Sequence, residues 1–169
     1  MADPNFDRTV VLVVADGADG SLGLVLNRPT PTAVADAFPG WEDVASDPAV
    51  VFGGGPVDSS AVICLAQQLV GGRMGEGWSP VAGRVGTLDL TGGPVGAAAA
   101  DGLRIFAGYA GWGPAQLESE VEAGGWFVVG AEASDVVGGD PGSLWRRVLR
   151  RQRSPLALVA AFPSDPADN

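Results

Sequence analysis

Two short segments place polar and aromatic side chains directly after apolar runs. Asn27 and Arg28 follow the run LGLVL, and Trp112 lies at a glycine-flanked corner at the end of LRIFAGYAG. A semi-buried arginine needs a carboxylate partner, and a large ring at such a corner is often a cover on the core or a platform for a ligand. We therefore predict a ligand or partner site made of Asn27, Arg28, Gly108, Tyr109, Gly111, Trp112, Gln116 and Glu118. The alternative is that Arg28 simply latches two segments together.

The residues that most enzymes use for catalysis are missing. The chain has no histidine, and its 10 basic residues are all arginines. This removes the commonest general base, imidazole metal ligands, Schiff-base chemistry and the lysine of a Walker phosphate loop. A serine then lacks its ordinary activating base, and the chain has no G-x-S-x-G motif. We predict no catalytic residue, no metal site and no cofactor.

Other candidates have simpler structural interpretations. Cys64 lies between isoleucine and leucine with no positive charge nearby in sequence, which indicates a buried structural thiol. Glu118 and Glu122 share a helical face, which we interpret as solvated rather than as a cation site. The glycine-rich AGYAGWGP lacks the Walker and dinucleotide spacings; its amides could hold an anion, but we favour a turn.

Charge is unevenly distributed along the chain. The formal net charge is -10, and residues 1–145 hold 18 carboxylates but only 5 arginines. Such a body repels nucleic acid and acidic membranes, so direct binding to either is disfavoured. Farther along, Arg147, Arg150 and Arg151 form a candidate interaction helix for a protein partner. The alternative is a solvated helix face, since the helix dipole favours positive charge near a C-terminus.

These candidates need a framework of short elements, because 26 glycines and 13 prolines favour many tight turns. Residues 9–15 read as a strand buried on both faces, and the strand after it should end at Pro29. Further strands are expected in AVVFGGG and SAVICLAQQL, which should pair, and in residues 84–90, LRIFAGYAG and LALVAAF. Helices are expected over 32–40 with Thr32 as N-cap, near 95–100, and in GPAQLESEVEAG and DPGSLWRRVLRRQ, with residues 70–81 as an exposed loop or hairpin tip.

The length favours one domain over 1–169, with flexible ends at 1–7 and 163–169. No apolar run approaches the roughly 20 residues that cross a bilayer, and the start has no cationic segment followed by a long apolar one. With one cysteine, nothing argues for secretion. We expect a cytoplasmic protein.

Four segments resemble the AlgH/YqgE family of bacterial proteins: GSLGLVLNRPT, VVFGGGPV, LRIFAGYAGWGPAQLESEV and SLWRRVLRRQ. The resemblance implies an α+β or mixed α/β fold with a twisted or barrel-like, mainly antiparallel sheet and flanking short helices. It implies little chemistry, since the family is largely uncharacterised and named for a regulatory role in alginate production. The chain departs from the family where Glu-His becomes Ala15-Asp16, and where the glycine of G-Q-L-E becomes Ala115. An activity that depends on that histidine cannot be shared here.

Three functions remain open. The first is a non-enzymatic binding or regulatory module, including a transcriptional regulator, whose site joins Asn27 and Arg28 to the corner at Gly108–Glu118. The second is an enzyme that uses carboxylates, Arg28 or Tyr109 with an unknown ligand, cofactor or metal. The third is an interaction or assembly protein that uses the arginine helix.

Overall fold

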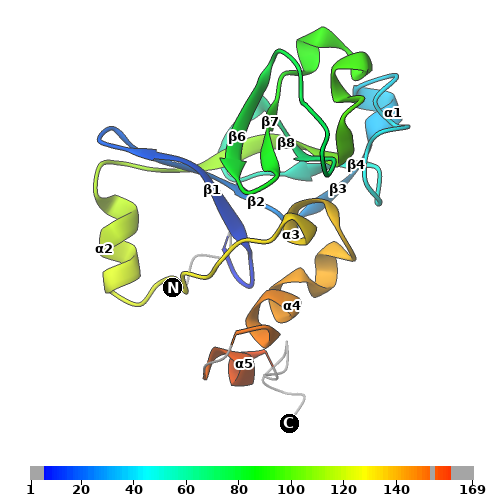
Figure 1. The fold of residues 1–169 in the computed structure, drawn as a ribbon. Coiled ribbons are helices and arrows are strands. Elements are labelled where there is room, and N and C mark those ends of the chain that lie inside the picture. Colours follow the sequence, from blue (N-terminus) through cyan, green and yellow to red (C-terminus); the bar gives the residue numbers. More distant parts are fainter. Residues whose placement is uncertain (1–5, 153–154, 161–169) are drawn as a thin grey trace.

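The computed structural model describes residues 6–152 and 155–160. Its eight strands form a sheet with the path β1-β2-β8-β5-β7-β6, and β4 joins β3 to β8. Every pairing in the described sheet is antiparallel except that of β4 with β8. The sheet curls into a nearly closed barrel (Figure 1), which confirms the fold class. The strands are β1 (Val11–Gly17), β2 (Gly20–Val25), β3 (Pro29–Ala33), β4 (Val50–Gly53), β5 (Val57–Gln68), β6 (Trp78–Ala82), β7 (Val85–Leu88) and β8 (Ala100–Trp112).

Short helices accompany this sheet. In Figure 1, α2 stands on one side of the β1–β2 hairpin, whereas α3, α4 and α5 follow one another below the barrel. Within residues 6–152 and 155–160, no helix combines the length and apolarity that crossing a membrane requires. The helices are α1 (Val34–Ala37), α2 (Gln116–Glu122), α3 (Ala133–Val137), α4 (Leu144–Arg150) and α5 (Leu156–Val159), with 3-10 turns at Leu90–Gly92, Pro94–Ala97 and Pro141–Ser143.

The two faces of β8 support two apolar clusters, because successive strand residues point to opposite faces. Phe106 packs on Phe52 in one cluster. Leu103 and Ile105 join Cys64 in the other. The expectation of a buried thiol is confirmed, and burial raises the pKa of Cys64 to about 12. This cysteine is therefore a small core residue rather than a nucleophile.

β1 is an edge strand, so the expectation of a strand buried on both faces is wrong. It pairs with β2 alone among the described strands, and a register shift between Val13 and Ala15 marks a bulge. Val13 is 39% exposed, and Ala15 and Asp16 are also exposed. An apolar β-branched run fits a half-covered edge as well as a covered strand, so composition alone did not separate the two.

Proline and the C-terminal run also behave differently from expectation. Pro29 begins β3 opposite Phe52 instead of ending a ladder, because the first residue of a strand needs no N–H bond. Leu156–Val159 form α5, not a strand, since a short apolar run fits either state. The rest of the run, residues 1–5 of the predicted flexible end 1–7, and the predicted flexible end 163–169 lie outside the described residues.

Several boundaries shift by a few residues. β4 and β5 do not pair with each other, because β8 lies between them. The first helix spans only Val34–Ala37, and Thr32 lies in β3 rather than at a cap. The segment near 95–100 is a 3-10 turn, and β6 takes the end of the expected loop at 70–81. The helices expected in GPAQLESEVEAG and DPGSLWRRVLRRQ are present as α2 and α4.

Candidate functional site

Three aromatic rings from distant parts of the chain meet beside β1. The Phe6 ring lies 6.3 Å from that of Trp112 and 5.3 Å from that of Trp126, measured between centroids. The two indoles are 5.9 Å apart in an edge-to-face arrangement. Such pairs add about 0.5–1.5 kcal/mol each beyond area burial. We call Phe6, Trp112 and Trp126 the aromatic cluster.

A single carboxylate fixes both indoles. Glu120 Oε2 accepts hydrogen bonds from Nε1 of Trp112 at 3.2 Å and from Nε1 of Trp126 at 2.8 Å. Its Oε1 accepts from Gln116 Nε2 at 2.9 Å, and Gln116 Oε1 in turn accepts from the amide of Gly113. The bonds from Trp126, Gln116 and Trp112 lower the pKa of Glu120, although partial burial opposes them. Glu120 is therefore held ionised as an acceptor.

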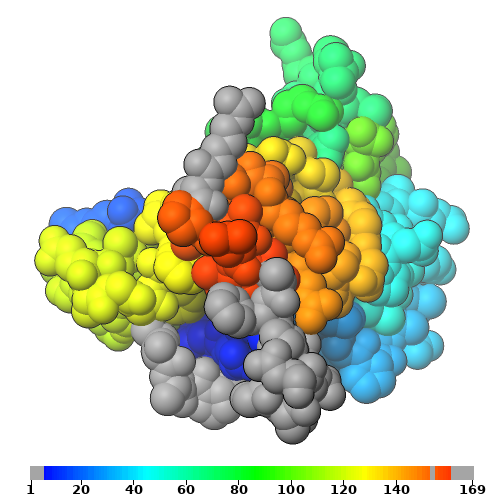
Figure 2. Space-filling view, turned by 90° about the horizontal axis from the view of Figure 1, so that it is seen from below, coloured from blue at the N-terminus to red at the C-terminus, as the bar shows by residue number. Residues whose placement is uncertain are grey.

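An apolar groove of about 450 Å³ opens next to the cluster. β1, α2 and the chain after α2 form its walls, and in Figures 1 and 2 the β1–β2 hairpin and α2 project together from one side of the molecule. Phe127 and Val128 at its rim are 54% and 77% exposed. We call this space the groove; its lining is Val11, Leu12, Val13, Asp16, Ala82, Trp112, Leu117, Val121, Trp126, Phe127, Val128, Val129 and Ala131.

A smaller cavity of about 220 Å³ adjoins the groove. Both are lined by Trp126 and Phe127, so this stretch of chain separates them. On the far wall of the cavity, the Arg8 guanidinium lies over the Trp145 ring, 5.1 Å from its centroid. A broader depression of about 660 Å³ near β7 includes no member of the aromatic cluster. The groove and cavity together are the candidate site.

Asn27 and Arg28 bind the N-terminal segment. Asn27 Oδ1 accepts from the Val10 amide at 3.0 Å, and its Nδ2 donates to the carbonyl of Arg8 at 2.9 Å. Arg28 is exposed, and its Nη2 donates to the carbonyl of Asp7 rather than to the carboxylate that we expected. The exposed guanidinium stays hydrated, so it needs no carboxylate.

β4 lies between Arg28 and the Gly108 end of the corner, because the Arg28 carbonyl accepts from the Gly53 amide at 2.8 Å and Gly53 pairs with Ala107, next to Gly108. Trp112, at the other end of the corner, pairs with Ser21, seven residues before Arg28. The N-terminal segment connects them, because Phe6 stacks on Trp112 and Asp7 accepts from Arg28. Asn27 and Arg28 thus position the aromatic cluster from a distance.

Most of the other predicted residues of the corner lie outside the aromatic cluster. Gly108 has φ +73, and a Cβ there would lie 2.7 Å from the Gly55 carbonyl oxygen, so only glycine fits without strain. Tyr109 packs partly buried against the core, and a Cβ on Gly111 would contact its ring. Glu118 is exposed on α2, next to the groove-lining Leu117 and about one turn before Val121. Of the predicted residues, Trp112 belongs to the aromatic cluster and Gln116 donates to Glu120, the acceptor of both indoles.

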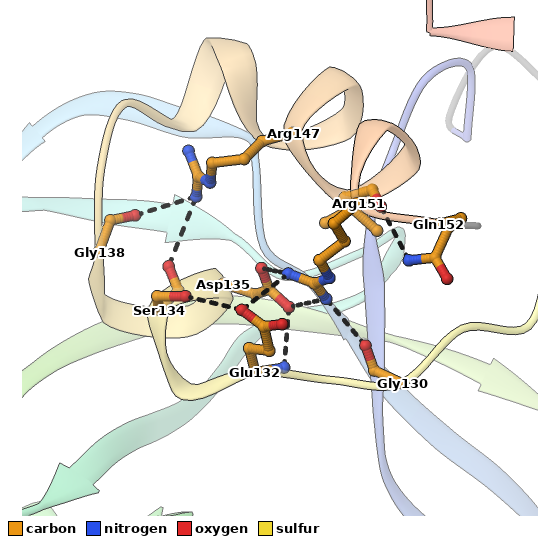
Figure 3. A network of polar contacts seen from close by, with 9 residues as sticks. Gly130, Glu132, Ser134, Asp135, Gly138, Arg147, Arg151 and Gln152 are labelled. Atoms are coloured by element: carbon orange, nitrogen blue, oxygen red, sulfur yellow. Dashed lines mark hydrogen bonds and ion pairs between the residues drawn. The ribbon is translucent and has the colours of Figure 1, made fainter. Parts of the chain in front are cut away.

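The arginine helix is partly tied to α3 (Figure 3). Arg151 forms a bidentate pair with Asp135, with both N···O distances 2.6 Å, and an ion pair with Glu132 at 3.4 Å. Arg147 donates to the carbonyls of Ser134 and Gly138 at 3.4 and 3.2 Å. Of the three predicted interaction residues, Arg150 alone is exposed.

Arg104 is a buried cation that sequence reasoning missed. It is 2% exposed on β8, donates through Nη2 to the carbonyls of Asp47 and Gly139, and lies over the Phe52 ring at 4.7 Å. Its Nε and Nη1 have no partner among the described residues. Burial, and then the nearby charge of Arg147, lower its pKa. The position of Arg104 inside the apolar run LRIF did not indicate that its guanidinium would be buried.

The aromatic cluster was only half predictable. Phe6 lay within the segment expected to be flexible, and Glu120 looked like one of several solvated acids on α2. Trp126 had a usable signal, since it opens the apolar run WFVV after two glycines, where an exposed platform is common. Chemically, the arrangement offers rigid apolar surface and one ionised acceptor, which suits binding.

Comparisons with known proteins agree with this architecture. The family model described as AlgH-like matches residues 1–157. A UPF0301 protein of Streptomyces avermitilis is 52% identical, covering 100% of this chain and 90% of that protein, and one of Mycobacterium tuberculosis is 45% identical, covering 100% and 85%. A crystal structure from Corynebacterium diphtheriae has a TM-score of 0.91 at 30% identity, covering 96% of this chain and 86% of that one. The solution structure of AlgH from Pseudomonas aeruginosa has a TM-score of 0.69 at 26% identity, covering 98% and 89%.

Proposed function

The chain belongs to the AlgH-like family, and from the geometry of its own groove we propose that it is a non-enzymatic binding module. The groove beside the aromatic cluster is its binding site. The observation that carries the proposal is the pairing of exposed apolar rim residues, Phe127 and Val128, with indoles fixed by Glu120. A volume of about 450 Å³ lies within the roughly 300–1,000 Å³ typical of ligand pockets.

Preorganisation supports binding at this place. The indoles contact Phe6 and share the Glu120 acceptor, so few side-chain rotations need to be frozen when an apolar group enters. Each rotamer-rich side chain that is already ordered saves about 0.5–1.5 kcal/mol on association. The rim remains open to solvent, which lets a ligand reach the cluster.

The enzyme alternative has less support. Glu120 is hydrogen-bonded by three donors and has a lowered pKa, which disfavours it as a general acid near neutral pH. Arg28 is bound to a carbonyl, and Tyr109 packs against the core. Within the interaction helix, Arg147 and Arg151 are engaged with α3, which weakens the assembly alternative too.

The proposal includes regulation through a bound partner in the cytoplasm. A regulator of transcription would act in this way without touching DNA, because residues 1–145 hold 18 carboxylates and 5 arginines and repel phosphates. The free thiol of Cys64 fits a reducing compartment.

Binding of the neutral hydrophobic dye Nile red tests the site. Val128→Asp places a charge on the groove rim, and its matched control Val95→Asp changes a valine that is 86% exposed elsewhere. We expect Val128→Asp to weaken dye binding about three- to tenfold, which corresponds to about 1 kcal/mol of lost apolar contact. Circular dichroism checks that both variants stay folded. No dye binding to the unchanged protein, or equal loss in both variants, would refute the proposal.

A further inference from the structure

The α2 side of the groove carries charge of one sign, whereas Arg8 lines the adjoining cavity. Asp16 belongs to the lining, and α2 beside it carries Glu118, Glu120 and Glu122 but no arginine. The side chains of Glu118 and Glu122 are exposed and make no ion pair or hydrogen bond with the described residues. Glu118 and Glu122 directly follow Leu117 and Val121 in α2, so the two carboxylates share one side of the helix next to this apolar wall.

Arg84, the arginine nearest in sequence to a groove-lining residue, makes its hydrogen bond away from the groove. Arg84 follows Ala82 by two residues, and its Nη1 donates to the carbonyl of Gln68 at 2.8 Å. Arg151, at the C-terminal end of α4, binds Asp135 and Glu132 instead. Glu118 and Glu122 thus form no ion pair within the part of the chain that the structure describes.

From this charge pattern we infer that the occupant of the groove is a segment of a partner protein in which apolar side chains alternate or are interspersed with lysine or arginine. Its apolar side chains enter between β1 and α2, and its cations face Glu118, Glu122 and Asp16. This deepens the proposed function and rests on it. Charge complementarity of this kind raises the association rate and suppresses wrong partners.

Two other occupants fit the charge less well. A second copy of the chain brings a net charge of -10, so its acidic body is repelled by the rim. The C-terminal residues 161–169 contain two aspartates and no basic residue, so they complement the rim no better. A segment of another protein that carries both apolar and cationic side chains complements the apolar wall and the acidic rim best.

Three defined peptides test the inference. The probe is an acetylated, amidated octapeptide of alternating leucine and lysine; one twin replaces lysine by glutamate and the other replaces leucine by serine. We expect the lysine peptide to displace Nile red and to bind at least about tenfold more tightly than either twin, with affinity that falls as salt rises. If the glutamate twin binds equally well, the inference is wrong.

Matched pairs of charge removals locate the contact. Glu118→Gln with Glu122→Gln removes the two rim charges, and Asp36→Asn with Asp43→Asn removes two exposed charges outside the lining. We expect about three- to tenfold weaker binding of the lysine peptide to the first pair only, since each exposed charge pair contributes modestly to affinity. Equal loss in both pairs would mean unspecific attraction and would overturn the assignment.

The two proposals fail in different ways. Absence of Nile red binding sinks the binding site itself, whereas dye binding without displacement by the lysine peptide sinks only the cationic occupant. Sedimentation equilibrium of the unchanged chain and of Val128→Asp tests whether a second copy of the chain occupies the groove. Self-association that Val128→Asp abolishes would assign the groove to a second copy and overturn the inference.

Discussion

The indole of Trp126 donates to Glu120 Oε2 at 2.8 Å, six residues back along the chain. Gly124 has φ +76 and follows α2, so the chain reverses direction and returns Trp126 toward the helix. This local turn brings Trp126 onto Trp112, and the two indoles share one acceptor.

Replacing Glu120 by glutamine should loosen the aromatic cluster. A neutral amide oxygen accepts more weakly than a carboxylate, and hydrogen bonds to charged groups are worth about 1.5–3 kcal/mol each. Because Glu120 is partly exposed, we expect a smaller loss, about 1–2 kcal/mol in the free energy of unfolding by urea. Glu118→Gln, on the same helix and exposed, is the control that should leave stability unchanged.

Acid should weaken the same contact. The pKa of Glu120 is lowered in the folded protein, so the unfolded state takes up a proton first as pH falls. Its contribution is therefore present above the ordinary glutamate pKa of about 4.3 and is lost as pH falls through the lowered folded pKa. The stability difference between the unchanged protein and Glu120→Gln should shrink over that window in urea unfolding. A constant difference from pH 6 to about pH 3 would contradict it.

Sequence periodicity located most strands and the helices α2 and α4, because these have strong local signals in apolar alternation, proline and glycine. It did not find the edge position of β1, since strand order depends on pairings between residues far apart, such as Ser21 with Trp112. It found Trp112 and Gln116 but missed Phe6 and Glu120, whose roles exist only after the barrel has closed.

Replacing Arg104 or Arg151 by methionine should change the stability of the protein in different ways. Arg104 has no carboxylate partner, so Arg104→Met removes an uncompensated buried charge. We expect the free energy of unfolding to stay the same or rise, and to fall by no more than about 1 kcal/mol. Arg151→Met leaves Asp135, 3% exposed, without its bidentate partner and should cost about 3 kcal/mol. Thermal and urea unfolding compare the two directly. A larger loss for Arg104→Met would show that its two carbonyl contacts outweigh the burial of its charge.

Changing Arg147, Arg150 and Arg151 together to glutamate is a poor test of partner binding, because Arg151 also pairs with Asp135. Arg151→Glu would place a second carboxylate against Asp135 and destabilise the fold, whereas Arg150→Glu changes an exposed side chain. The single Arg150→Glu variant should remain as stable as the unchanged protein in urea. Measurable destabilisation would indicate a structural contact for Arg150.

Ala115→Gly should stabilise the protein. Ala115 precedes α2 with φ +58, in the left-handed region where an L-residue costs about 1–2 kcal/mol, and it stands where the resemblance led us to expect glycine. Glycine removes that strain but loses more backbone entropy, so we expect a net gain of about 0.5–1 kcal/mol in urea unfolding. Ala123→Gly is the matched control, because Ala123 at the other end of α2 has φ -73 and gains nothing from glycine. A loss of stability in both variants would mean that Ala115 is held without strain.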